Sequence, residues 1–201
     1  MRMLYNKLRR LIFKLIKALL LIIFLAIVAG FKYYEMRYFK PHIPYIEKFY
    51  HQAKKEETFT EEVRNIIFCL ETSSDNELKN SSYFSSVIAR HFVYELIEYQ
   101  KISEWHLHNF LWSRLLTYYF DEEKIFILYL HLIPFEHGFG LANSAQYYFQ
   151  KKISQLTVEE VVMLLGIARS PKTFSPYYRP ENAQQIQAIL MQQLKESNCL
   201  H

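Results

Sequence analysis

The strongest hydrophobic pattern in the chain is an apolar run near the N-terminus. Residues 18–31 carry no charged side chain, and extending the run back to Leu11 adds only Lys14 and Lys17. The 21 residues from Leu11 to Phe31 would form a helix about 30 Å long, which matches the hydrocarbon core of a bilayer. Lysines near the end of such a helix can extend toward the lipid headgroups. The pattern therefore predicts one transmembrane helix.

The residues on either side of this run predict its orientation. Six basic residues and no acidic residue precede Ala18, and the cytoplasmic flanks of membrane helices are enriched in Lys and Arg. We therefore expect a cytoplasmic N-terminus, with an interfacial belt of aromatic residues after the helix, namely Tyr33, Tyr34, Tyr38 and Phe39. A cleaved signal peptide ending near Ala29-Gly30 and a buried core helix are the alternatives. The long basic segment and the long apolar run favour a retained anchor.

The rest of the chain predicts a mainly α domain. Pro41 and Pro44 interrupt the helix after the membrane exit, and residues 51–60 are polar. This divides the chain into a basic tail and anchor (1–40), a linker (41–60) and a domain (61–201). Apolar positions at helical spacing predict helices over residues 61–71, 83–100, 103–120, 122–133, 141–152, 157–168 and 181–197.

Capping residues and breaks support these boundaries. Ser103 and Asp121 are candidate N-caps, and Thr157 with Glu160 forms a capping-box pattern. Between the helices, the sequence predicts a polar loop over 72–82, a turn at 137–140 and an extended stretch around the Ser-Pro pairs at 170–171 and 175–176. No strand pattern is longer than a few residues, which leaves a mainly α architecture.

Composition and charge exclude several classes of protein. The chain is 51% hydrophobic and 22% charged, which excludes a disordered chain. Two cysteines exclude a disulfide scaffold and a four-cysteine zinc site. The net charge of +4 is unevenly distributed: residues 1–40 hold nine Lys/Arg and one acid, whereas the remaining 161 hold 15 bases and 19 acids. We therefore expect no nucleic-acid partner.

Residues 129–180 carry several motifs in a fixed order. These are Tyr129-Leu130-His131, FEHGFG at 135–140, AQYYFQK at 145–151, LTVEE at 156–160, LLG at 164–166 and the two Ser-Pro pairs. This stretch resembles the C-terminal half of the peptidoglycan glycosyltransferase domain, glycosyltransferase family 51, over about residues 120–195. Because the chain ends where such a domain would end, we expect the monofunctional transglycosylase type.

The resemblance implies a fold, an activity and a location. It implies a lysozyme-like helical glycosyltransferase domain, preceded here by one transmembrane helix, that polymerises lipid II. The ligands would be lipid II and undecaprenyl-diphosphate glycan, and other cell-wall synthesis proteins would be candidate partners. The location would be the bacterial inner (cytoplasmic) membrane, with the domain on the extracytoplasmic side.

The upstream motifs diverge from those of the family. Residues 66–72 fit its first motif, with Glu71 in the place of the catalytic glutamate and Thr72 replacing an aspartate. Residues 85–91 fit its Gly-Ser-Thr-Ile-Thr-Gln-Gln run without the glutamines. Its Arg-Lys-x-x-Glu motif falls on residues 105–109, so that Trp105 replaces the arginine and Asn109 the second glutamate. Ile127 replaces the glutamate that precedes Tyr-Leu-Asn in the family.

The chemistry that the resemblance implies needs a base for a sugar hydroxyl. A carboxylate within hydrogen-bond reach can take the proton as the hydroxyl attacks. Glu71 follows an apolar run, where desolvation would raise the pKa of its carboxyl group. We predict Glu71 as the base, with a solvent-facing glutamate at a helix end as the alternative.

The diphosphate leaving group needs cations or a bridging metal ion. The basic candidates are Arg90, His91, His106, His108, Arg114 and Lys124. We predict substrate contacts from Ser86, Arg90, His91, Asn109 and Lys124, and from the turn glycines Gly138 and Gly140. The sequence does not decide whether a divalent cation is a cofactor, and we assign no metal ligand. His106 and His108 would point about 200° apart on a helix and would not share an ion.

Two hypotheses of function follow. One is an active glycosyltransferase with Glu71 as base. The other is a catalytically degenerate relative that binds or scaffolds in cell-wall assembly, which the replaced motif residues favour, since a fold alone does not imply a function. A third, an unrelated helical membrane-associated protein, is disfavoured by the ordered motifs. The enzyme hypothesis predicts that Glu71 faces a cleft containing Arg90, Asn109 or Lys124.

Overall fold

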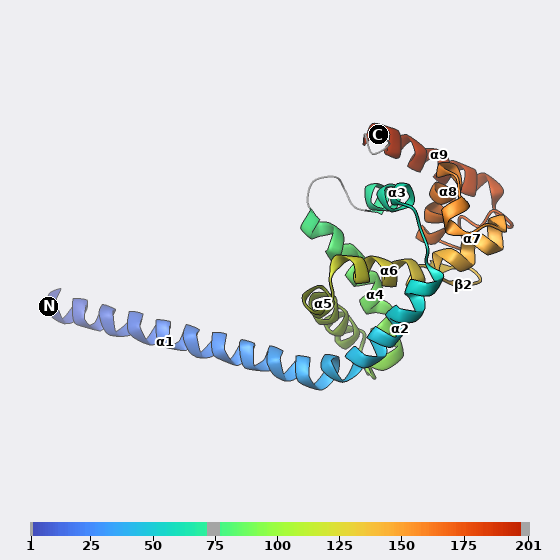
Figure 1. Ribbon diagram of the computed structural model, residues 1–201. Coiled ribbons are helices and arrows are strands. Elements are labelled where there is room, and N and C mark those ends of the chain that lie inside the picture. Colours follow the sequence, from blue (N-terminus) through green and yellow to red (C-terminus); the bar gives the residue numbers. More distant parts are fainter. Residues whose placement is uncertain (1, 72–76, 198–201) are drawn as a thin grey trace. The chain divides into compact units, whose positions relative to one another are not determined.

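The computed structural model describes residues 2–71 and 77–197. The chain forms two compact units, Met1–Ile43 and Pro44–His201, which are described separately. Within the described residues the architecture is almost entirely helical (Figure 1). This confirms the predicted mainly α fold.

The first unit is one long helical path. Helix α1 (Arg2–Tyr34) passes into a π-helical turn (Glu35–Phe39) and a 3₁₀ turn (Lys40–His42). Its apolar side chains from Ile12 to Val28 are exposed, and this is the one helix in the described part of the chain that is long and apolar enough to cross a membrane. The α-helical geometry is interrupted at residues 35–42, where Pro41 lies in the 3₁₀ turn, and Pro44 is the second residue of the next α-helix. This agrees with the predicted interruption near the two prolines.

The second unit contains the remaining elements. Its helices and strands, in chain order, are α2 (Ile43–Glu56), α3 (Glu61–Glu71), α4 (Glu77–Leu96), α5 (Ile102–Tyr119), α6 (Glu122–Leu132), β1 (Pro134–Phe135), β2 (Gly138–Phe139), α7 (Leu141–Phe149), α8 (Val158–Arg169) and α9 (Pro180–Glu196). The two strands form a minimal antiparallel hairpin, in which Pro134 pairs with Phe139 and Phe135 with Gly138. A 3₁₀ turn (Ile153–Gln155) joins α7 to α8.

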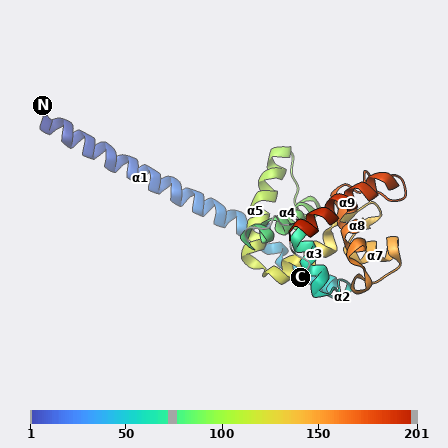
Figure 2. The same cartoon turned by 90° about the horizontal axis from the view of Figure 1, so that it is seen from above.

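Helix α6 is the core helix of this unit. Seven of its eleven residues are buried, as expected for a helix that is apolar on all sides. Helix α4 packs against α5 and α6, while α8 packs against α9 and α3 (Figures 1 and 2). The buried ring of Phe126 on α6 contacts the rings of Phe59, Phe68 and Phe84, and so joins these groups of helices.

Some predicted local features are confirmed. Asp121 caps α6, since its side chain accepts a hydrogen bond from the backbone N–H of Lys124 at 2.8 Å. Thr157 and Glu160 form the predicted capping box at the start of α8.

Other predicted features are wrong. Ser103 is not an N-cap: the cap position of α5 is Lys101, and the Glu104 carboxylate accepts from the Gln100 N–H. Residues 43–56 of the expected linker form α2, because Ile46, Tyr50 and Ala53 lie on one buried helical face. Helix α4 begins at Glu77, within the expected polar loop, whose residues 72–76 lie outside the described part. The division of the chain at residues 40 and 60 stays a prediction.

Candidate functional site

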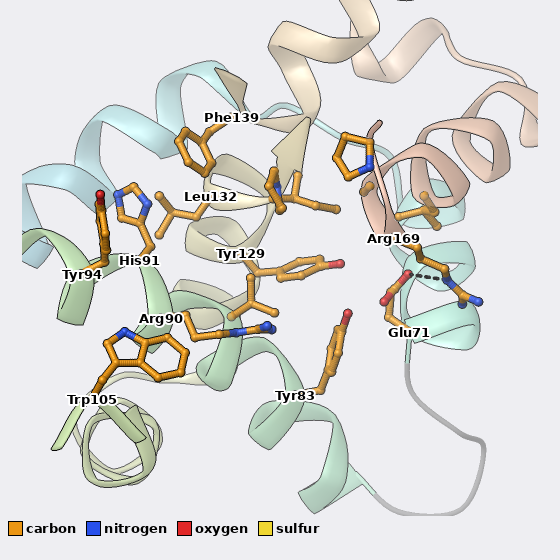
Figure 3. A pocket seen from close by; sticks show the side chains of 16 residues that line it. Glu71, Tyr83, Arg90, His91, Tyr94, Trp105, Tyr129, Leu132, Phe139 and Arg169 are labelled. Carbon is orange, nitrogen blue, oxygen red and sulfur yellow. Dashed lines mark ion pairs between the residues drawn. The ribbon is translucent and has the colours of Figure 1, made fainter. Parts of the chain in front are cut away.

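A pocket of about 580 Å³ opens in the second unit. Helices α3, α4, α5, α6 and α8 contribute to its lining, together with the β1–β2 hairpin (Figure 3). Its polar and aromatic lining residues are Glu71, Tyr83, Arg90, His91, Tyr94, Trp105, Tyr129, Phe139 and Arg169. Segments that are distant in the sequence therefore meet at one cavity.

Glu71 is the last residue of α3 and faces this pocket. Its side chain is only 6% exposed, because Val63, Ile66, Ile67 and Leu70 draw α3 into the core. Burial raises the pKa of the Glu71 carboxyl group, while a hydrogen bond from Tyr83 and the positive charge of Arg169 act in the opposite direction. The alternative of a solvent-facing glutamate is wrong.

Two tyrosines extend the polar groups around Glu71. Burial, followed by the neighbouring Glu71 charge, raises the pKa of Tyr83 to about 12. Burial also raises the pKa of Tyr129, which is hydrogen bonded to Tyr83. Both phenols therefore stay protonated near neutral pH and can donate hydrogen bonds. The phenol groups of Tyr83 and Tyr129 and the Glu71 carboxylate point toward one another in the pocket (Figure 3).

Two guanidinium groups reach the pocket from different helices (Figure 3). Arg169, the last residue of α8, lies with Nε 3.9 Å from Glu71 Oε1, and its Nη2 donates to the backbone oxygen of Leu70 at 3.0 Å. Arg90 projects from α4, is exposed, and donates a long hydrogen bond of 3.4 Å to the backbone oxygen of Ser86. Among the described lining residues, Glu71 is the one carboxylate. The pocket can thus bind an anion close to a buried base.

The structure brings together three of the predicted site residues, Glu71, Arg90 and His91. His91 pairs with Glu95 at 3.2 Å, and its ring packs edge-on to Phe139 with centroids 5.1 Å apart. Burial lowers the pKa of His91 despite the nearby Glu95. A neutral His91 can accept or donate one hydrogen bond at the pocket wall.

Three other predicted residues lie outside the described pocket lining, and each is bonded to another group. Ser86 Oγ donates to the Tyr83 backbone oxygen, and Asn109 Nδ2 donates to that of Trp105. Lys124 pairs with Glu47 at 2.9 Å. The expected cleft therefore contains Arg90 but neither Asn109 nor Lys124, and their substrate contacts are unsupported by this placement.

The two turn glycines act on the pocket indirectly. Gly138 and Gly140 have φ angles of +139° and +99°, a range that favours glycine. Between them, Phe139 carries the side chain that lines the pocket. In the structure the two glycines shape the hairpin that presents Phe139, and their role in substrate binding stays a prediction.

Arg169, Tyr83 and Tyr129 were missed as site residues. Tyr129 begins the Tyr-Leu-His motif, and Arg169 directly precedes the first Ser-Pro pair, so both positions lay within recognisable motifs. No sequence motif singles out Tyr83 in the same way. Within the described residues, no group of three or more His, Cys, Asp or Glu side chains could hold a metal ion.

Comparison with known proteins agrees with the helical fold and the motif order. Residues 85–195 match the family model described as transglycosylase. Penicillin-binding protein 1A of Aquifex aeolicus is 33% identical over 78 residues, which are 38% of this chain and 11% of that protein. Penicillin-binding protein 1A of Neisseria flavescens is 32% identical over 81 residues, 40% of this chain and 10% of that protein.

A third relative covers more of both chains. A protein of Cupriavidus necator that is named as a transglycosylase is 29% identical over 124 residues, 61% of this chain and 52% of that protein. The chain thus spans about a tenth of the penicillin-binding proteins and about half of the Cupriavidus protein. The match to the family model begins at Ser85, so Glu71 lies upstream of it.

Proposed function

The chain belongs to the transglycosylase family, and on that premise we propose that it is a membrane-anchored peptidoglycan glycosyltransferase that polymerises lipid II into glycan strands. The observation that carries the proposal is the position of Glu71. Its buried carboxyl group faces a pocket that also contains the guanidinium groups of Arg90 and Arg169. A base and two cations are what displacement of a diphosphate by a sugar hydroxyl requires.

In the proposed reaction, the 4-hydroxyl oxygen of one sugar attacks the anomeric carbon of the other. The Glu71 carboxylate takes the hydroxyl proton as the new carbon–oxygen bond forms. The bond from the anomeric carbon to the diphosphate breaks, and the leaving undecaprenyl diphosphate keeps the bonding electrons. Arg90 and Arg169 stabilise this negative charge through charge-assisted hydrogen bonds.

A catalytic base must also be in a suitable protonation state, and Tyr83 and Arg169 help to set that of Glu71. Burial favours the neutral carboxyl group, whereas the Tyr83 hydrogen bond and the Arg169 charge favour the carboxylate. The balance places the pKa of Glu71 above that of an ordinary glutamate. A carboxylate with a raised pKa is a stronger base than an exposed one.

The proposed location is the bacterial cytoplasmic membrane, with α1 as the anchor. The exposed apolar side chains of α1 support a lipid-facing helix, and the six bases that precede Ala18 support a cytoplasmic N-terminus. The second unit would then act on the outer side of the membrane, where a lipid-linked substrate can reach the pocket.

One observation favours a second candidate function. Glu71 is the single carboxylate in the described pocket lining, so among these residues no second acid takes the place of the motif residue that is altered to Asn109. A relative that binds lipid II without polymerising it, as a scaffold for other cell-wall proteins, fits this lining.

Labelled lipid II separates the two functions. The full chain in detergent micelles is incubated with it, and glycan chains on a gel and retained lipid II are measured in parallel. We expect glycan chains, fewer of them with Arg90→Met, and a wild-type yield with the exposed control Arg179→Met. Retained lipid II without chains would overturn the polymerase in favour of the binding protein. If neither glycan chains nor retained lipid II is detected, both proposed functions are overturned.

A further inference from the structure

Glu57 is a buried acid outside the pocket that the proposed chemistry does not use. It lies between α2 and α3, and its side chain is 1% exposed. Both carboxylate oxygens have partners: Oε1 lies 3.3 Å from Nδ1 of His131, and Oε2 accepts from the backbone N–H of Ala142 at 3.1 Å. His131 is in the last turn of α6 and Ala142 in the first turn of α7. One side chain therefore bridges two helix ends.

These two helix ends enclose the β1–β2 hairpin. The hairpin occupies residues 134–139 and carries Phe139, which lines the pocket beside His91 (Figure 3). A Cβ atom at Gly140 would lie 3.3 Å from Glu57 Oε1, which shows how closely the carboxylate approaches the backbone after the hairpin. Glu57 thus contacts both ends of this connection, while Glu56 Oε2 lies 3.5 Å from the same His131 nitrogen.

The sequence of α7 explains why an external carboxylate is needed. The first N–H groups of a helix have no partner within the helix. Gly140 occupies the N-cap position of α7 and provides no side-chain cap. Glu57 supplies the missing acceptor from a distant segment, and its negative charge interacts favourably with the N-terminus of a helix. Burial raises the pKa of Glu57, while His131 and the Ala142 N–H act to lower it.

We propose that Glu57 is a positioning residue for the pocket: by holding His131 and Ala142, it fixes the hairpin so that Phe139 forms one wall. The ring of Phe139 is 49% exposed and is free to contact a ligand. The consequence for lipid II rests on the proposed function, since lipid II is the ligand whose apolar surfaces Phe139 would contact. The contact between Glu57 and the hairpin does not depend on that function.

Two substitutions separate the effect of side-chain length at position 57 from the effect of its charge. Glu57→Asp keeps the charge but is one methylene too short to hold both partners, whereas Glu57→Gln keeps the length and can accept from Ala142 while donating to His131. We expect Glu57→Asp to weaken lipid II binding about tenfold, and Glu57→Gln to bind within about twofold of wild type. Glu62→Asp is the matched control, because Glu62 is exposed on α3.

A double-mutant cycle with Phe139→Ala tests the route of the effect. If Glu57 acts through Phe139, Glu57→Asp has no further effect on lipid II affinity in the Phe139→Ala protein. Independent effects that multiply would overturn the proposal, because a general loss of stability would act in both backgrounds. Wild-type affinity in Glu57→Asp would overturn it as well.

Amide hydrogen exchange tests the same contact without lipid II. We expect Glu57→Asp to accelerate exchange at Ala142 at least tenfold, with no change in α9. Unchanged exchange at Ala142 would overturn the positioning role. If the wild-type chain bound no lipid II, the proposed function would fail, and the exchange measurement would still decide whether Glu57 holds the hairpin.

Discussion

Replacing Arg169 with methionine tests how the pocket sets the protonation of Glu71. The substitution keeps most of the apolar stem and removes the charge that lies 3.9 Å from Glu71 Oε1. Two unit charges at that separation interact by about 1 kcal/mol in water and about 4 kcal/mol at an effective dielectric constant of 20. Arg169 is 35% exposed, so solvent screening favours the lower part of this range. A loss of about 1.4 kcal/mol corresponds to one pKa unit.

The direction of the expected pKa shift follows from the positive charge of Arg169. Its charge lowers the pKa of Glu71, so Arg169→Met raises it. Glu71 acts as a base only when ionised, and the acidic limb of kcat/KM for lipid II polymerisation should move up by about one pH unit. The pH profile of polymerisation measures this shift, with Arg179→Met as a control that leaves the limb in place. A limb that stays at the wild-type pH, or moves down, would refute the electrostatic reasoning.

Three further substitutions test stability. Burial raises the pKa of Glu71 above the 4.5 of an unfolded glutamate. The folded state therefore loses stability as pH rises from 4.5 through the raised pKa, and Glu71→Gln should melt above wild type at pH 7 but level with it at pH 4. A lower melting temperature at pH 7 would contradict this. Thr157→Ala removes the acceptor for the Glu160 N–H and should cost about 1 kcal/mol in urea unfolding; no loss would exclude the cap. Phe126→Ala empties a fully buried site and should cost about 3–5 kcal/mol in the same experiment, and a cost under about 1 kcal/mol would argue against this core.

Features that depend on neighbouring residues could be predicted from the sequence. The spacing of Val63, Ile66, Ile67 and Leu70 predicts the buried face of α3, which is observed. The buried position of Glu71 is also observed, but its prediction rests on the family resemblance and not on this spacing. The Asp121 cap and the Thr157–Glu160 box are likewise local and are present. The α2 helix was missed because its three buried positions are separated by polar residues that resemble a linker.

Features that depend on long-range packing could not be predicted. Arg169 lies far from Glu71 in the sequence, and only the packing of α3 against α8 brings the two together. Asn109 and Lys124 carry suitable chemical groups, but Asn109 is bonded to the backbone of its own helix and Lys124 to Glu47 of α2. The rotation of each helix about its axis decides which of its side chains reach the pocket. Where the motif residues have changed, a resemblance in motif order does not specify this rotation.

The most direct test of Glu71 as the catalytic base is the single-turnover rate of lipid II polymerisation by Glu71→Gln at saturating substrate. Glutamine has nearly the same shape but cannot accept the proton, so the rate should fall by about 10²–10⁴-fold while lipid II is still retained. Glu62→Gln, an exposed position on the same helix, should polymerise at the wild-type rate. Polymerisation by Glu71→Gln at the wild-type rate would contradict the account.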